Sequence, residues 1–233
     1  MASAAYEARK ASLTTYFDRT AAAAWEALTS EAPVSRIRAT VRAGRLRMRE
    51  LILSRLPADL AGGTLLDAGC GTGALATEAA RRGAGVTAVD VSPRLVETAR
   101  DRLAQAAHAG SIRFVVGDML DPALGRFDHV VAMDSLIHYP QAEIVQALAA
   151  LAARAERSIL FTVAPRTPLL TIMHAAGKLF PRADRSPAIL PVAPARLARA
   201  IAASPDLAGW RLAHSERITS GFYLSQLFEL VRR

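Results

Sequence analysis

Cysteine, long hydrophobic runs and acidic residues are all scarce in this chain. Cys70 is the only cysteine among 233 residues, so an internal disulfide is excluded and a reducing, cytoplasmic environment is expected. No run of ~18 consecutive apolar residues occurs, which argues against a helix that spans a membrane. Residues 1–19 contain no apolar segment of the kind found in secretory signals. We therefore expect a cytoplasmic protein whose membrane contact is at most peripheral.

The shortage of acidic residues makes the chain basic. Lysine and arginine number 29 against 21 aspartate and glutamate residues, which gives a formal net charge of +8. Such a charge suits nucleic acid, a membrane surface or an acidic small molecule, and it does not choose among them. Because alanine and arginine are also abundant in proteins from GC-rich genomes, the charge alone identifies no function.

Strand and helix patterns alternate from residue 63 onward. Segments typical of buried strands cover 64–67, 86–91, 112–116, 127–133 and 158–163. This alternation predicts an α/β fold, a parallel sheet with helices on both faces. Two further strands are predicted over 210–218 and 222–231.

Four parts follow from this pattern. Residues 1–62 are predicted to be helical, and a helix over 35–56 carries seven arginines. Residues 63–165 are predicted to form the cofactor-binding core, and residues 195–233 its C-terminal part. Residues 166–194 hold several prolines and form an insertion. Because it follows the carboxyl end of a strand, this insertion is expected to cover the ligand crevice.

A glycine-rich motif, residues 67–73 with the sequence DAGCGTG, joins the first strand to a helix. Its glycines let a ligand lie against the backbone, at the positive end of the helix dipole. With Asp90 downstream, the motif also matches the dinucleotide fingerprint G-x-G-x-x-G/A. Asp67 distinguishes a dinucleotide from S-adenosylmethionine as the ligand. A carboxylate repels the pyrophosphate of a dinucleotide, but it attracts the sulfonium and ammonium groups of S-adenosylmethionine. The motif resembles motif I of the class I methyltransferases, in which Asp67, Gly69 and Gly71 would contact this cofactor.

Acidic residues stand at the ends of four predicted strands. They are Asp67, Asp90, Asp118 and Asp134. Because ligands of open α/β sheets bind at the carboxyl ends of strands, we expect these side chains to converge. An ionised carboxylate only accepts hydrogen bonds, so Asp90 suits the two ribose hydroxyls. For Asp134, a role as a helix or turn cap is an equally good interpretation.

Neighbouring residues complete the predicted cofactor site. Val91 is expected to pack on the adenine. Asp118 and Met119 resemble the third methyltransferase motif, in which the acid takes the adenine amino group and the next backbone N–H meets the ring. Met133 is placed to offer its carbonyl to the ammonium, and Arg42 to hold the carboxylate.

His138 follows the fourth strand, in the stretch DSLIHYP over residues 134–140. A lone histidine is more often structural, but a position beside the cofactor motif favours a functional role. We therefore take His138 as the candidate catalytic residue.

Stretches spread over nearly the whole chain together resemble the magnesium-protoporphyrin IX O-methyltransferase family. They are Tyr16-Phe17, Val34-x-Arg36-Ile37, LDAGCGTG over 66–73, DSLIHYP over 134–140, Phe161-x-x-Ala164-Pro165, Leu179-Phe180-Pro181 and FYLSQL over 222–227. All class I methyltransferases share the glycine motif, whereas the His-Tyr-Pro and Leu-Phe-Pro stretches are more particular.

The resemblance implies a Rossmann-like class I methyltransferase fold, with a seven-stranded, mostly parallel sheet and an N-terminal helical lid. It implies methyl transfer from S-adenosylmethionine to a propionate of magnesium protoporphyrin IX in (bacterio)chlorophyll synthesis, leaving S-adenosylhomocysteine. Tyr16 would be the lid tyrosine over the cofactor, and His138 the catalytic histidine. The resemblance also implies a partner, the porphyrin-binding subunit of magnesium chelatase. Peripheral contact with the inner or photosynthetic membrane is compatible with it. Asp18 and the arginine-rich lid depart from the family pattern.

The acceptor of such a reaction is a flat dianion with apolar faces. Its wall is expected to come from Ile137, Leu169, Met173 and Phe180, and no metal site is predicted. A propionate has a pKa of about 4.3, so it is ionised at neutral pH and needs no general base. We therefore favour His138 as a group that orients the carboxylate over one that abstracts a proton.

Two alternatives stay open at this stage. One is another small-molecule O-methyltransferase, of the quinone or phenol type, whose acceptor would need a base. The other is a non-catalytic nucleotide-binding or nucleic-acid-binding module, suggested by the charge and the fingerprint overlap. Against binding of single-stranded nucleic acid, the N-terminal arginines lack interleaved aromatic residues. A dehydrogenase is disfavoured by Asp67.

Overall fold

The computed structural model describes residues 4–16, 18, 35–103, 110–166 and 189–233. Three of the predicted substrate contacts, Leu169, Met173 and Phe180, lie outside these residues.

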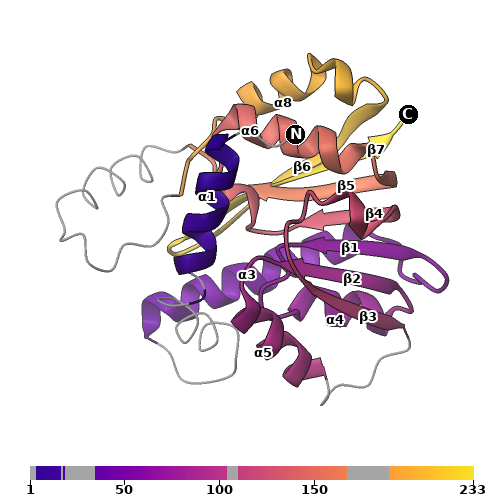
Figure 1. Cartoon of the computed structure of the whole chain (residues 1–233). Coiled ribbons are helices and arrows are strands. Elements are labelled where there is room, and N and C mark those ends of the chain that lie inside the picture. Colours follow the sequence, from indigo (N-terminus) through magenta and orange to yellow (C-terminus); the bar gives the residue numbers. More distant parts are fainter. Residues whose placement is uncertain (1–3, 17, 19–34, 104–109, 167–188) are drawn as a thin grey trace.

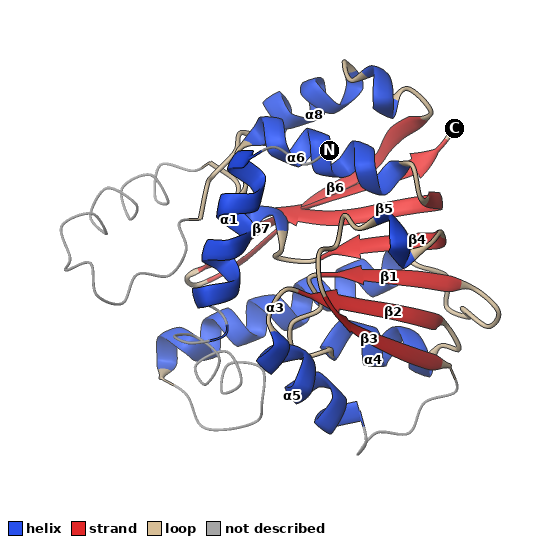
Figure 2. Cartoon of the chain, viewed as in Figure 1, coloured by secondary structure: helices blue, strands red, loops and turns tan. Residues whose placement is uncertain are grey.

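Helices and strands alternate along the described part of the chain (Figure 2). The longer helices are α1 (Ala4–Thr15), α3 (Arg36–Arg55), α4 (Ala74–Arg81), α5 (Pro93–Leu103), α6 (Gln141–Ala152) and α8 (Pro194–Ala202). The strands are β1 (Thr64–Ala68), β2 (Gly85–Asp90), β3 (Ser111–Val116), β4 (Phe127–Ala132), β5 (Ala155–Val163), β6 (Trp210–Ser220) and β7 (Tyr223–Arg232).

The seven strands form one sheet in the order β3-β2-β1-β4-β5-β7-β6 (Figure 1). Strands β1 to β5 run parallel, whereas β7 pairs antiparallel with both β5 and β6. The predicted seven-stranded, mostly parallel sheet is therefore confirmed. The strand order reverses between β1 and β4, and such a switch point is where open α/β sheets bind ligands.

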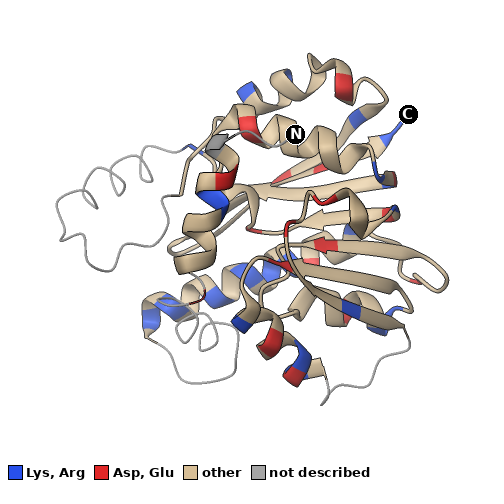
Figure 3. Ribbon diagram, viewed as in Figure 1, with Lys and Arg blue, Asp and Glu red and all other residues tan. Residues whose placement is uncertain are grey.

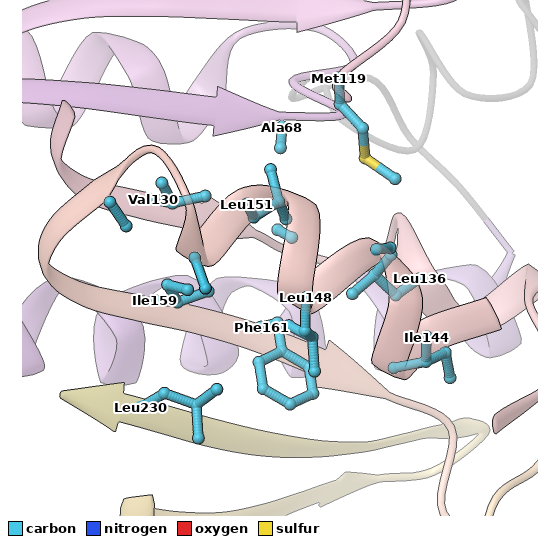
Figure 4. Packing of buried hydrophobic residues seen from close by; sticks show 14 of the residues in the cluster. Ala68, Met119, Val130, Leu136, Ile144, Leu148, Leu151, Ile159, Phe161 and Leu230 are labelled. Carbon is cyan, nitrogen blue, oxygen red and sulfur yellow. The ribbon is translucent and has the colours of Figure 1, made fainter. Parts of the chain in front are cut away.

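Both faces of the sheet are covered by helices, because neighbouring residues of each strand point to opposite faces. Leu66 belongs to one buried cluster and Leu65 to the other. In the first cluster α6 packs on β5, where Leu148 lies beside Phe161 (Figure 4). In the second, helices α3 and α4 cover the sheet, and Met48 of α3 is fully buried.

Helix α3 docks on the β6–β7 hairpin through a close contact at Gly44. A Cβ atom on Gly44 would stand 2.5 Å from the Cδ1 atom of Tyr223. Beside this contact, the Ser220 hydroxyl donates to the Thr40 carbonyl over 3.0 Å. The 1–62 region therefore supplies a helix of the core, α3, as well as α1.

Helix α1 lies across the carboxyl ends of the strands (Figure 1). The rings of Tyr6 and Tyr139 stack with centroids 5.5 Å apart, and Arg9 Nε lies 3.2 Å from Glu143 Oε2. These contacts hold α1 against the start of α6.

Helices of membrane-spanning length and hydropathy do not occur among the described residues.

Candidate functional site

A cavity of about 470 Å³ opens at the carboxyl ends of β1, β2, β3 and β4. Helices α1 and α3 contribute to its wall, as do the glycine motif and the turn after β4. The lining includes Tyr6, Leu13, Arg42, Arg45, Leu46, Arg49, Asp67, Gly69, Gly71, Asp90, Val91, Asp118, Met119, Met133, Asp134, Ser135, His138 and Tyr139.

The four strand-end acids all lie in this cavity. Asp118, Asp90, Asp67 and Asp134 follow one another in that spatial order, since each belongs to or follows one of the neighbouring strands β3, β2, β1 and β4. Three strand spacings span roughly 14 Å. The acids therefore form a row that an extended ligand can follow.

The glycine motif folds as a tight turn against the segment that follows β4. Gly69, Gly71 and Gly73 have φ angles of 86°, 53° and 77°, which non-glycine residues rarely adopt. A Cβ atom on Gly69 would stand 2.5 Å from the Cβ atom of Ser135. Glycine is needed here because any side chain would push the two segments apart.

Asp90 is pre-organised for a ligand with two hydroxyl groups. Its Oδ2 accepts the backbone N–H of Gly71 over 2.8 Å, and its Oδ1 accepts that of Ser92 over 3.0 Å. A carboxylate offers about four acceptor positions, so acceptor capacity remains for a ligand. Burial raises the pKa of Asp90, while these backbone N–H groups lower it.

Asp67 is almost completely buried, with 2% of its surface exposed, and its Oδ2 atom has no hydrogen-bond partner within the described structure. Burial and the negative charge of Asp90 raise the pKa of Asp67 to about 7. Ser135 Oγ, another wall atom, also lacks a partner among the described residues. Unpartnered buried polar atoms are costly, so both are suited to meet a polar ligand.

Asp118 connects the cavity to helix α1. Its Oδ1 accepts the Tyr6 hydroxyl over 2.7 Å and the Leu120 N–H over 2.8 Å, and its Oδ2 lies 2.9 Å from Lys10 Nζ. These hydrogen bonds outweigh partial burial and lower the pKa of Asp118. An adenine amino group would therefore share this carboxylate with α1.

Asp134 is not a helix or turn cap in the structure. Within the described residues it is the one non-glycine residue with a positive φ, 55°, and its side chain accepts from several elements. It pairs with Arg45 of α3 and accepts the hydroxyls of Tyr223 and Thr162, each over 3.1 Å. Asp134 thus joins α3, β5 and β7 at the cavity wall.

The remaining predicted site residues fall into two groups. Val91, Met119, Met133 and His138 line the cavity, and His138 is buried, with 7% exposed. Ile137 and Tyr16 are half-buried and are not among the lining residues. The Ile137 carbonyl instead accepts the N–H of Leu190 over 2.8 Å.

Tyr6, Arg45 and Arg49 line the cavity and were missed from the sequence as site residues. Tyr223, which is not among the lining residues, was likewise missed as a partner of Asp134. For the arginines a signal existed, because Arg42, Arg45 and Arg49 recur at spacings of three and four and so share one face of α3. Basic residues run along α3 in Figure 3. Neither tyrosine has a comparable signal.

The cavity fits S-adenosylmethionine by its chemistry. Asp90 presents acceptors for a diol, Asp67 presents a buried acceptor for a cation, and Leu95 and Met119 are apolar wall residues. Within the described residues, no group of three or more metal-ligating side chains occurs.

Comparisons with known proteins point to one family. The family model of the magnesium-protoporphyrin IX methyltransferase C-terminus matches residues 132–232, and that of a methyltransferase domain matches 65–156. A magnesium-protoporphyrin O-methyltransferase of Rhodobacter capsulatus is 50% identical over 215 residues, covering 92% of each chain. The chloroplastic magnesium protoporphyrin IX methyltransferase of Arabidopsis thaliana is 34% identical, over 93% of this chain and 69% of that protein.

A solved structure gives the same result. The magnesium protoporphyrin IX methyltransferase of Synechocystis PCC 6803, crystallised with bound SAH, superposes with a TM-score of 0.84 at 27% identity. The match covers 96% of this chain and all of that one, 100%.

Proposed function

The chain belongs to the magnesium-protoporphyrin O-methyltransferase family, and we propose that it transfers the methyl group of S-adenosylmethionine to a propionate carboxylate of magnesium protoporphyrin IX. The observation that carries this proposal is the row of four acids in one cavity, with His138 buried at its wall. The products are the monomethyl ester and S-adenosylhomocysteine, in (bacterio)chlorophyll biosynthesis.

The chain's own residues bind the cofactor along the row of acids. Asp90 holds the ribose hydroxyls, and Asp118 with Met119 meets the adenine beside Val91. The glycine motif admits the rest of the ligand to the backbone, and Asp67 and the Met133 carbonyl face the ammonium. All these residues line the cavity, which supports their assignment to the cofactor.

The reacting carboxylate needs orientation more than activation. It is ionised at neutral pH, and the cofactor when bound supplies a methyl group made electrophilic by its sulfonium. Charge is dispersed as the carboxylate attacks, so excluding water from the cavity favours the reaction. The stacked pair of Tyr6 and Tyr139 closes the α1 side of the wall. His138 then holds a carboxylate oxygen in line with the methyl group.

The acceptor's apolar faces are proposed to meet Ile137, Leu169, Met173 and Phe180, with Tyr16 closing over the cofactor. These roles rest on the family resemblance. The position of Ile137, half-buried and directly before His138, supports its place in this wall.

Partners and location are proposed on the same basis. The porphyrin-binding subunit of magnesium chelatase would hand over the metalloporphyrin. A formal net charge of +8 suits peripheral contact with an anionic membrane surface.

Single-turnover methyl transfer from labelled S-adenosylmethionine tests the proposed function. Magnesium protoporphyrin IX is compared with metal-free protoporphyrin and a simple phenol, using the wild type and His138→Ala. We expect esterification of the metalloporphyrin only, slowed about 10²- to 10³-fold in His138→Ala, because the aligned geometry is lost.

The control is binding of S-adenosylhomocysteine to both proteins, which should be unchanged since His138 is assigned to the acceptor. Transfer to the phenol instead would identify a quinone-type or phenol-type enzyme. Cofactor binding without transfer to any acceptor would contradict the assignment as an enzyme.

A further inference from the structure

Ser135 lines the cavity with a buried hydroxyl that has no hydrogen-bond partner within the described structure. It stands at the N-cap of the short 3₁₀ helix η3 (Leu136–His138), yet its side chain makes no capping hydrogen bond. A serine at an N-cap usually accepts a backbone N–H of the turn that follows. Because a buried hydroxyl left unpaired costs free energy, a ligand is a physical reason to keep one here.

The backbone around η3 relates Ser135 to His138. Ser135 has helical dihedral angles, φ −92° and ψ −36°, so it continues the turn of η3 backward by one residue. A 3₁₀ helix has about three residues per turn, and side chains at i and i+3 eclipse one another. Ser135 and His138 therefore project from the same side of the turn, and both line the cavity.

Ser135 also lies against the glycine motif. A Cβ atom on Gly69 would stand 2.5 Å from the Cβ atom of Ser135 and 3.3 Å from its Oγ. The hydroxyl is thus placed between the motif assigned to the cofactor and His138, which is assigned to the acceptor. Methyl transfer requires the acceptor oxygen and the methyl group to meet at about 3 Å, so the two ligands have to touch in this region.

The reacting propionate needs donors at this place. An ionised carboxylate only accepts hydrogen bonds, and it presents two oxygens. A hydroxyl and an imidazole on one side of a turn supply a donor for each oxygen. Asp134, which precedes Ser135, is held in an ion pair by Arg45, so its charge is compensated beside the incoming carboxylate.

Resting on the proposed function, we propose that the Ser135 hydroxyl donates a hydrogen bond to one oxygen of the reacting propionate, while His138 holds the other oxygen in line with the methyl group. The oxygen held by His138 forms the bond to the methyl carbon. The carbon–sulfur bond breaks, and its electron pair goes to the sulfur. No proton is transferred, so Ser135 keeps its hydrogen and acts by fixing the plane of the carboxylate at a second point.

The test compares two porphyrins that differ only in their free carboxylates. Binding of magnesium protoporphyrin IX and of its dimethyl ester to the complex with S-adenosylhomocysteine is followed by porphyrin fluorescence, for the wild type and Ser135→Ala. We expect Ser135→Ala to bind the free acid about 10-fold more weakly, because a hydrogen bond to a charged group is lost. Its affinity for the dimethyl ester should stay within about twofold of the wild type. Single-turnover transfer should slow about 10- to 100-fold.

Ser158→Ala is the matched control. Ser158 is also a buried serine, but its Oγ lies 2.8 Å from His129 Nδ1 and it is not among the lining residues. Ser158→Ala should unfold at a Tm about 2–4 °C lower, because a satisfied hydrogen bond is lost, and should transfer methyl groups at the wild-type rate. Ser135→Ala should show the reverse, slower transfer with a Tm no lower than that of the wild type.

Wild-type affinity of Ser135→Ala for the free acid, or equal weakening of both porphyrins, would overturn the assignment. So would weaker binding of S-adenosylhomocysteine itself, since Ser135 would then contact the cofactor. None of these binding results depends on methyl transfer. Failure of the wild type to esterify the metalloporphyrin would therefore contradict the proposed function, while the two porphyrins would still decide whether Ser135 binds a propionate.

Discussion

Asp67 of β1 and Asp90 of the neighbouring strand β2 behave differently because of what surrounds them. Asp90 accepts two backbone N–H groups, whereas Asp67 keeps one oxygen without a partner in the described structure. The pKa of Asp67 consequently rises to about 7, with burial as the largest cause and the charge of Asp90 as the second. Asp67 therefore changes charge within the physiological range.

Cofactor binding should depend on pH through Asp67. Below pH 7 the free protein holds this carboxyl protonated, and an ammonium ligand favours its ionised form, so binding releases a proton. We expect the affinity for S-adenosylhomocysteine to rise about tenfold from pH 6 to pH 8. Calorimetry in two buffers of different ionisation enthalpy measures both the affinity and the proton release.

Asp67→Asn should bind with a flat pH profile, while His138→Ala should keep the wild-type profile. The second variant is needed because histidine side chains commonly titrate in the same range. A profile that flattens in His138→Ala and persists in Asp67→Asn would refute the role given to Asp67.

Among the elements, α3 shows how one helix can serve both the core and the site. Its buried residues Met48 and Ile52 pack against the sheet, while Arg45 and Arg49 reach the cavity. Gly44 permits this arrangement by bringing the helix onto the Tyr223 ring. A glycine inside a helix normally costs about 1 kcal/mol relative to alanine, so its presence here reflects packing.

Replacing Gly44 by alanine tests this role of the helix. The added Cβ would stand 2.5 Å from Tyr223 Cδ1 and 2.8 Å from Tyr223 Cβ, so the helix or the hairpin must move. We expect Gly44→Ala to lower the free energy of unfolding by about 1–3 kcal/mol despite its better helix propensity. Urea denaturation measures the change.

Arg47→Ala, at an exposed position of the same helix, controls for helix propensity and should shift stability by less than about 0.5 kcal/mol. A Gly44→Ala protein more stable than the wild type would mean that the contact with Tyr223 yields without cost.

At the scale of the whole molecule, the cavity lies where separate parts of the chain meet. Helices α1 and α3 come from the first 62 residues, and the strand ends come from the sheet. The aromatic stack of Tyr6 on Tyr139 and the ion pair of Arg45 with Asp134 cross this boundary. A ligand in the cavity therefore contacts both parts and should stabilise them together.

Thermal unfolding measures that coupling. At a concentration of S-adenosylhomocysteine about 100 times its Kd, binding to the folded state adds about 2.7 kcal/mol. For a chain of this length that corresponds to a Tm higher by about 5–10 °C. NAD at the same concentration should leave Tm unchanged, because Asp67 opposes a pyrophosphate. Stabilisation by NAD equal to that by S-adenosylhomocysteine would contradict the methyltransferase interpretation of the glycine motif.

The sequence alone determined what depends on local pattern. Buried strands followed by helices are encoded residue by residue, so the seven strands were predicted and confirmed. The carboxyl ends of parallel strands share one edge, so the meeting of Asp67, Asp90, Asp118 and Asp134 could also be predicted. The resemblance to the family was carried by short stretches, and the comparisons confirm it.

Only the tertiary structure decided which side chains from distant positions line the cavity or hold its lining residues. Tyr6 pairs with Asp118 across 112 residues, and Tyr223 with Asp134 across 89. The ion pair of Arg45 with Asp134 likewise exists only because α3 packs beside the turn after β4. The physical reason is that periodicity reports which face of an element is buried, whereas a specific hydrogen bond or ion pair exists only once the elements have packed.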